Sequence, residues 1–152
     1  MKNTEITVQV FDDYENIKEK LLEKGYTETE ILTGEDYYFT TLKPSEIKVS
    51  SYSNLIHSSI IIRSVSEQFS GKKFNTILYK NKILDENENE LSEEKFAISI
   101  DNISNAKKIF AFSGLQNWVT VKQENHFFKC GEKTIIVGKV KMLDGCFIEI
   151  EE

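Results

Sequence analysis

Cysteine, proline and glycine are scarce: the chain of 152 residues has two cysteines, one proline and seven glycines. Cys130 and Cys146 make neither a disulfide framework nor a zinc-binding spacing. We therefore expect free thiols and a cytoplasmic location. The shortage of proline and glycine leaves few candidate linkers, and the length suits one domain. These absences predict a single domain over residues 1–152.

Long apolar runs and clustered basic residues are missing as well. The longest purely apolar run, residues 60–62, is far below the ~20 residues that a transmembrane helix needs. The first five residues lack the apolar run of a secretion signal. The formal net charge is −6 and no basic stripe follows the sequence, whereas nucleic-acid binding needs clustered lysine and arginine. We expect neither a membrane nor a nucleic acid as a partner.

Alternation of apolar and polar residues dominates what is present. The segment 5–10 alternates strictly, which is typical of a strand with two different faces. Helices are predicted over 12–25 and 103–113, where aspartate or asparagine stands near the start and glycine near the end. Further strands are predicted over 36–42, 47–51, 58–65, 74–83, 95–100, 118–130, 133–140 and 146–151. This order favours an α+β fold with an antiparallel sheet and two main helices.

Several strands carry apolar residues on one face and polar or ionisable residues on the other. In the longest of them, Thr120, Lys122, Glu124 and His126 share the polar face. Periodicity alone favours an ordinary sheet, with helices on one face and water on the other. A barrel that encloses the polar face requires a further argument.

That argument comes from six short motifs that follow one another along nearly the whole chain. They are Asn3-Thr4-Glu5-Ile6-Thr7, Asp36-Tyr37-Tyr38-Phe39, Ile60-Ile61-Ile62-Arg63, Ile77-Leu78-Tyr79-Lys80, Val119-Thr120-Val121-Lys122 and Phe147-Ile148-Glu149-Ile150-Glu151. The ordered set resembles the CYTH family of triphosphate-tunnel metalloenzymes, which includes class IV adenylate cyclases, thiamine triphosphatases and inorganic tripolyphosphatases. The resemblance implies a tunnel-like antiparallel β-barrel with the two helices packed outside, and a triphosphate or organic phosphate as ligand.

The resemblance also implies roles for individual residues. The implied phosphate-binding residues are Arg63, Lys80, Lys122 and Lys139, of which Lys80 and Lys122 would also be catalytic. The implied ligands of Mg²⁺ or Mn²⁺ are Glu5, Glu149 and Glu151. Cations offset the charge of a triphosphate, and carboxylates hold a metal ion that bridges phosphate oxygens and activates water.

The sequence departs from the family pattern at several charged positions. Asn3 and Thr7 replace the first glutamate and the first lysine of the opening strand, Glu124 stands where a cation is expected, and Gly138 replaces an aspartate. Two interpretations therefore stay open. The chain binds a triphosphate or polyphosphate and, if it is an enzyme, hydrolyses it with a metal ion; or it is a non-catalytic ligand-binding or protein-interaction module on a degenerate barrel. Formation of cyclic AMP is disfavoured, because no nucleotide-specific positioning is recognisable.

Some candidates also have a purely structural interpretation. Arg63 can be the ion-pair partner of a carboxylate across the sheet, and Glu149 and Glu151 can be exposed residues on an edge strand. His57 and His126 are far apart in sequence, which favours surface or hydrogen-bonded structural histidines over proton carriers. Of the two, His126 is expected on the concave polar face.

Overall fold

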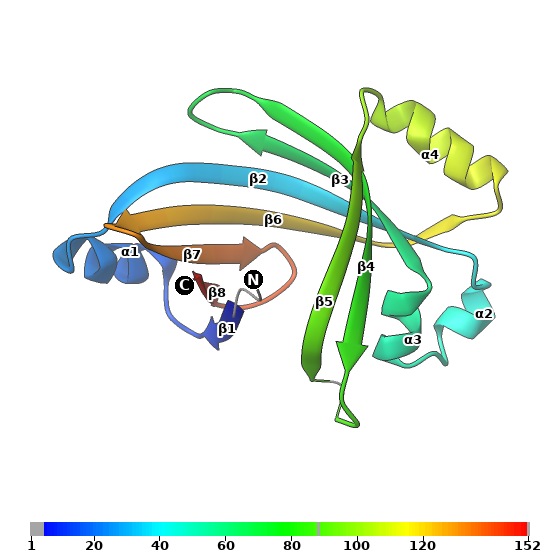
Figure 1. Ribbon diagram of the computed structural model, residues 1–152, viewed down its shortest axis with the longest axis horizontal. Coiled ribbons are helices and arrows are strands. Elements are labelled where there is room, and N and C mark those ends of the chain that lie inside the picture. The colour runs from blue at the N-terminus through cyan, green and yellow to red at the C-terminus, as the bar shows by residue number, and fades with distance from the viewer. Residues whose placement is uncertain (1–4, 88, 152) are drawn as a thin grey trace. The chain divides into compact units, whose positions relative to one another are not determined.

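The computed structural model describes residues 5–87 and 89–151, without the side chains of Glu5, Glu90 and Glu151. The elements, labelled in Figure 1, are β1 (Glu5–Val10), α1 (Tyr14–Glu23), β2 (Thr27–Thr40), α2 (Pro44–Ile47), α3 (Tyr52–His57), β3 (Ser59–Glu67), β4 (Lys73–Leu84), β5 (Glu90–Ser99), α4 (Ile103–Phe112), β6 (Gln116–Cys130), β7 (Lys133–Val140) and β8 (Cys146–Glu151). None of the described helices is long and apolar enough to cross a lipid bilayer.

The eight strands form one sheet in the order β1-β8-β7-β6-β2-β3-β4-β5. Antiparallel ladders join β1 to β8, β8 to β7, β7 to β6 and β4 to β5. The predicted α+β class with an antiparallel sheet is confirmed.

The chain divides into two compact units, each built from separate stretches of sequence. Unit 1 comprises residues 1–34, 65–73 and 121–152, and unit 2 comprises residues 35–64 and 74–120. Each unit has its own cluster of buried apolar side chains. The single domain over residues 1–152 stays a prediction.

Helix α1 supplies the core of unit 1. It begins after Asp13, whose side chain accepts a hydrogen bond from the Glu15 amide, as expected of an N-cap. Beyond its end, Gly25 adopts a φ of 83°, a conformation that is unstrained only for glycine. The buried face of the helix packs against β6, β7 and β8 through Tyr14, Ile17, Leu21, Phe128, Val137 and Cys146.

Helix α4 contributes to the core of unit 2. Asn102 caps its first turn by accepting from the Asn105 amide. Ala106 is buried against Phe39 of β2 and Ile62 of β3, and the ring of Phe110 meets Phe39 edge-on with 5.1 Å between centroids. One face of β2, β3 and β4 is thereby covered by α4. By strand alternation, Asp36 and Arg63 lie on the other face.

The strand predicted over 47–51 is wrong, because two short helices lie on either side of residues 48–51. Pro44 opens α2, and the Glu46 carboxylate accepts a hydrogen bond from the Lys43 amide at 2.6 Å. Ser51 caps α3 by accepting from the Asn54 amide. These local hydrogen bonds outweigh the weak alternation of the segment.

Candidate functional site

The basic face of unit 2 is the face of β2, β3, β4 and β5 that does not pack against α4. Pairing places Lys80 opposite Lys95 and Lys82 opposite Glu93, so these four side chains share a face. Arg63 joins them, because its guanidinium is one of the cations that act on Lys80. We use the name basic face for Arg63, Lys80, Lys82 and Lys95, together with the carboxylates Asp36 and Glu93.

Arg63 is fixed by a two-pronged ion pair. Its Nε and Nη2 donate to Oδ1 and Oδ2 of Asp36 at 2.7 and 2.6 Å. Asp36 is buried, and its hydrogen bonds raise the pKa of Arg63. The carboxylate partner that the structural interpretation of Arg63 expects is present, and phosphate binding by its guanidinium stays a prediction. The pair orients the guanidinium and leaves Nη1 outside it.

Lys80 lies in a different electrostatic setting. Its Nζ is 3.7 Å from Oε2 of Glu93, and the same oxygen is 3.4 Å from Nζ of Lys82. Burial lowers the pKa of Lys80, Glu93 opposes this, and the nearby cations Arg63, Lys82 and Lys95 lower it further. Two half-buried ammonium groups therefore share one carboxylate at distances too long for strong hydrogen bonds. An added anion would lower the electrostatic energy of this face.

Two aromatic residues form the neighbouring part of the basic face. Tyr38 and Trp118 meet edge-on with 5.9 Å between centroids, and Trp118 Nε1 donates to Ser59 Oγ at 2.9 Å. Burial raises the pKa of Tyr38, with Asp36 adding to the effect. The Tyr38 hydroxyl is therefore neutral at physiological pH, and the site gains no further negative charge from it.

The implied metal ligands lie in unit 1, on β1 and β8. Pairing sets Glu5 opposite Glu151 and Thr7 opposite Glu149, which places all of them on one face of two neighbouring strands. Carboxylates are the hard oxygen ligands that Mg²⁺ and Mn²⁺ prefer, which is why the resemblance assigns the metal to these three residues. Among the side chains that the structure describes, no group of three or more His, Cys, Asp or Glu is placed to hold an ion. The metal site stays a prediction, and Asn3 lies outside the described residues.

Lys139 and Lys122 lie on the opposite face of the unit 1 strands from Glu149. Val137 pairs with Ile148 and Ile136 with Glu149, so Lys139 shares the face of Ile148. There its Nζ is 3.9 Å from Oε1 of Glu124 and 5.3 Å from the centroid of the Tyr14 ring. Lys122 is exposed and shares this face with Glu124 by strand alternation. Phosphate binding by Lys122 and Lys139, and catalysis by Lys122, stay predictions.

His126 is buried between two carboxylates and a tyrosine. Its Nδ1 is 2.7 Å from both Glu28 Oε1 and the Tyr14 hydroxyl, and its Nε2 is 2.8 Å from Glu124 Oε1. The expectation of a hydrogen-bonded structural histidine is confirmed. The polar face that His126 was expected to occupy is, however, covered by α1, because Tyr14 packs against the imidazole with 4.2 Å between ring centroids.

The carboxylate of Glu28 anchors this network. Lys18 Nζ donates to Oε2 at 2.8 Å, and the Tyr14 hydroxyl donates to Oε1 at 2.6 Å. Burial alone raises the pKa of Glu28, but the hydrogen bonds from Lys18, Tyr14 and His126 lower it to about 2. The pKa of Tyr14 is raised, chiefly by burial and next by the hydrogen bond to Glu28. Every charged group of this network thus has an opposite charge within reach.

Sequence reasoning found Arg63 and Lys80 but not the groups that surround them. The missed residues of the basic face are Asp36, Lys82, Glu93 and Lys95. A signal for Lys82 was present, since it follows Lys80 at the two-residue spacing of a strand. Asp36 opens one of the six motifs, but no role was assigned to it there. Glu93 and Lys95 depend on which strand pairs with which and in what register, and a single sequence does not specify this.

Comparison with known proteins supports the fold. No protein-family model matches the chain, and neither does any curated protein. Among solved structures, the PH1819 protein from Pyrococcus horikoshii OT3 is 20% identical, with a TM-score of 0.70 over 97% of this chain and 77% of that chain. The PH1012 protein from the same organism is 21% identical, with a TM-score of 0.64 over 98% of this chain and 77% of its own.

A third similar structure carries a functional name. A protein from Vibrio parahaemolyticus, designated a "putative adenylate cyclase", is 16% identical, with a TM-score of 0.60 over 98% of this chain and 74% of that chain. Adenylate cyclases of class IV are among the proteins that the six sequence motifs resemble. At these identities the likeness shows the fold, which agrees with the CYTH resemblance of the sequence.

Proposed function

We propose that this protein binds a phosphate-rich anion, a triphosphate or an organic phosphate, on the basic face of unit 2. The observation that carries the proposal is the excess of cations there. Among the described side chains, Arg63, Lys80, Lys82 and Lys95 face two carboxylates, Asp36 and Glu93. This local excess contrasts with a formal net charge of −6 for the whole chain.

The chemistry of these cations suits phosphate. Arg63 offers a planar guanidinium whose orientation Asp36 fixes, and such a group recognises phosphate oxygens with little loss of conformational entropy. Lys80 and Lys82 are half-buried, so their attraction for an anion is screened less than that of surface lysines. A ligand with several phosphate oxygens could contact more than one of these cationic side chains at once. Nucleoside triphosphates are among the ligands to test, because the similar Vibrio parahaemolyticus protein is designated a "putative adenylate cyclase".

Hydrolysis of the bound anion is a more specific proposal than binding alone. The resemblance assigns Mg²⁺ or Mn²⁺ to Glu5, Glu149 and Glu151 of unit 1, and such an ion would lower the pKa of a bound water. Lys80 would stabilise negative charge that develops on the phosphate. A catalytic role of Lys122 rests on the resemblance alone, because Lys122 and Glu149 lie on opposite faces of the unit 1 strands. Loss of one positioned charge costs on the order of 100-fold in rate, so the substitutions at Asn3, Thr7, Glu124 and Gly138 favour weak hydrolysis or binding alone.

A thermal-shift titration tests the binding. Tripolyphosphate and ATP are added, each with and without Mn²⁺, to the wild type, to Lys80→Met and to the control Lys108→Met, which changes an exposed lysine of α4. A ligand that binds only the folded state adds about 2.7 kcal/mol of stability at one hundred times its Kd. We expect a shift in the wild type and in the control, and little or none in Lys80→Met.

Each other outcome has a defined meaning. No shift with any phosphate in the wild type contradicts the proposal, and an equal shift in Lys80→Met contradicts its location on the basic face. Glu149→Gln tests the metal separately, because only the Mn²⁺-dependent part of the shift should then disappear. Release of inorganic phosphate that requires Mn²⁺ and is lost in Lys80→Met would show hydrolysis, whereas binding without release would favour the non-catalytic interpretation.

A further inference from the structure

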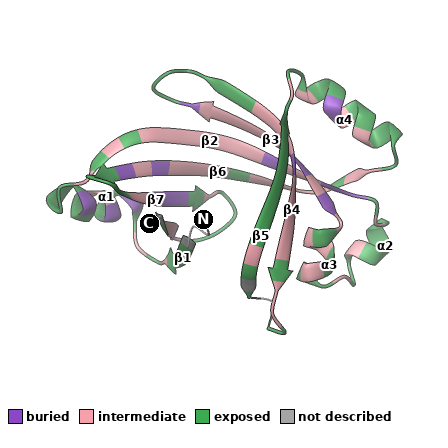
Figure 2. Cartoon of the chain, in the orientation of Figure 1, coloured by how far each residue is buried: buried purple, intermediate pink, exposed green. Residues whose placement is uncertain are grey.

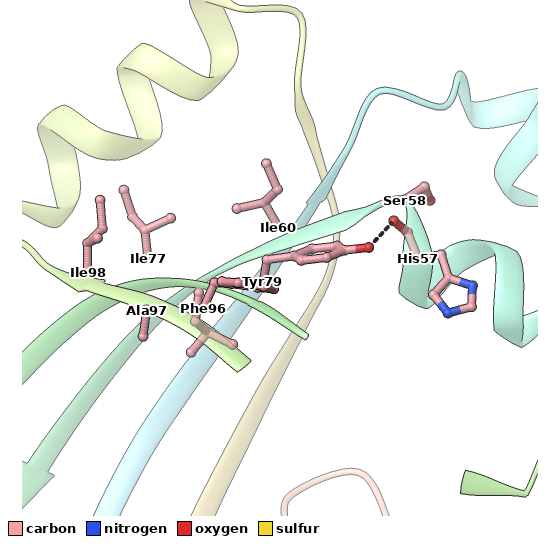
Figure 3. A pocket seen from close by; sticks show the side chains of 9 residues that line it. His57, Ser58, Ile60, Ile77, Tyr79, Phe96, Ala97 and Ile98 are labelled. Atoms are coloured by element: carbon pink, nitrogen blue, oxygen red, sulfur yellow. Dashed lines mark hydrogen bonds between the residues drawn. The ribbon is translucent and has the colours of Figure 1, made fainter. Parts of the chain in front are cut away.

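An open apolar pocket of about 480 Å³ lies in unit 2, and most of the strand residues that line it belong to the face opposite the basic face. Figure 3 shows Ile60 of β3, Ile77 of β4 and Ile98 of β5 pointing to the same side, with the ring of Tyr79 reaching toward the end of α3. Ile77 and Ile98 are directly paired, as are Tyr79 and Phe96. Because Lys80 and Lys82 alternate with Tyr79 along β4, their side chains leave the strand on the other face. The volume lies in the range typical of small-molecule sites.

The polar groups around the pocket are already engaged with the protein itself. The Tyr79 hydroxyl donates to the carbonyl oxygen of His57 at 3.3 Å, as the dashed line in Figure 3 marks, and His57 Nε2 contacts the carbonyl oxygen of Lys82. The Ser58 hydroxyl donates to the carbonyl oxygen of Leu55 at 3.1 Å. No charged side chain of Asp, Glu, Lys or Arg lines the pocket in the described part of the chain. The lining therefore favours an occupant without charge.

Aromatic rings mark one wall. Tyr79 and Phe96 lie with their planes 23° apart and 6.4 Å between centroids, and Phe96 is 53% exposed. Ile98 beside it is 63% exposed. A flat ring laid against Phe96 and the isoleucines would remove apolar surface from water and gain stacking contacts.

We propose that this pocket binds a neutral small molecule with a planar aromatic group, independently of the phosphate ligand. The lining without Asp, Glu, Lys or Arg, the near-parallel rings and the volume of the pocket together support this class of ligand. A second copy of the chain is a poorer fit, although β5 is the last strand of the sheet and is exposed along most of its length (Figure 2). The run Glu93-Glu94-Lys95 in the middle of β5 is the kind of charged segment that opposes strand addition at a sheet edge.

Titration with N-phenyl-1-naphthylamine, a neutral aromatic probe that fluoresces in apolar surroundings, tests the proposal. The lining variants are Phe96→Ser and Ile98→Asp. Their controls are Phe74→Ser and Ile109→Asp, because Phe74 is 51% and Ile109 63% exposed and neither lines the pocket. We expect saturable one-to-one binding by the wild type, a Kd raised at least about tenfold in the lining variants, and a change of less than about twofold in the controls.

The same experiment contains the results that would overturn the proposal. Absence of saturable binding by the wild type, or an equal loss in the controls, would rule the pocket out as a ligand site. Light scattering that shows a dimer, together with its dissociation in Ile98→Asp and no probe binding, would assign the face to a second copy instead. Tripolyphosphate should leave the probe bound, and displacement would contradict independence of the two ligands. Thermal unfolding of each variant confirms that it is folded.

Discussion

The two units handle buried charge in different ways. In unit 1, His126, Glu28, Tyr14 and Lys18 are joined by contacts of 2.6–2.8 Å, so that each charge has a close partner. In unit 2, Lys80 and Lys82 share Glu93 at 3.7 and 3.4 Å. Close partners stabilise the fold, whereas the longer contact of Lys80 with Glu93 leaves its charge only partly neutralised. The difference separates a hydrogen-bonded network in unit 1 from the face of unit 2 that we propose to bind an anion.

The largest expected effect tests the ion pair between Arg63 and Asp36 on the basic face. Arg63→Met leaves the buried Asp36 carboxylate without its partner, which should lower the free energy of unfolding by about 3–5 kcal/mol. Urea unfolding at pH 7 measures the loss. The double variant Asp36→Asn/Arg63→Met should recover part of the stability, because the buried charge is then gone.

If Arg63→Met instead unfolds at the same urea concentration as the wild type, the ion pair has no structural role. Close ion pairs would then not stabilise unit 2 in the way that we infer for unit 1. A stability loss in Arg63→Met also means that ligand binding must be judged from Lys80→Met.

The next effect tests the network of unit 1. The pKa of Glu28 is lowered to about 2 in the folded state from an ordinary 4.5, so its stabilisation is fully present above pH 4.5. It is lost as the pH falls through the folded pKa. Glu28→Gln should therefore be about 3 kcal/mol less stable than the wild type at pH 7, with a difference that shrinks between about pH 4.5 and 2. Urea unfolding across this pH range provides the measurement.

Its control is Glu19→Gln, which changes an exposed carboxylate of α1 outside the network. This variant should follow the wild type at every pH. A Glu28→Gln stability that runs parallel to the wild type down to pH 2 would show that the close contacts in unit 1 do not stabilise the fold.

The sequence predicted most of the sheet and both long helices, because alternation and helix caps are local signals. The strands β1, β4, β7 and β8 begin and end within one residue of the predicted bounds. Helices α2 and α3 were missed, because the hydrogen bonds of Glu46 and Ser51 that start them compete with a strand pattern of only five residues.

The site was predicted less completely than the fold, for a physical reason. Arg63 and Lys80 were recognisable from their motifs, yet what surrounds them depends on register, which sets Lys80 opposite Lys95 and Lys82 opposite Glu93. His126 shows the same limit. Its strand face was predicted from alternation, but the packing of Tyr14 against it is a contact over 112 residues of sequence.

The smallest effect on stability falls on the residue with the largest expected effect on binding. The pKa of Lys80 is lowered chiefly by burial, so its charged form costs stability at neutral pH, and this cost is relieved as the pH rises through the lowered pKa. Lys80→Met removes the charge and keeps the aliphatic volume. The free energy of unfolding should therefore stay constant or rise by less than about 1 kcal/mol, while the shift with tripolyphosphate disappears. A strongly destabilised Lys80→Met would mean that its contact with Glu93 is structural, and the distinction between the two units would then be lost.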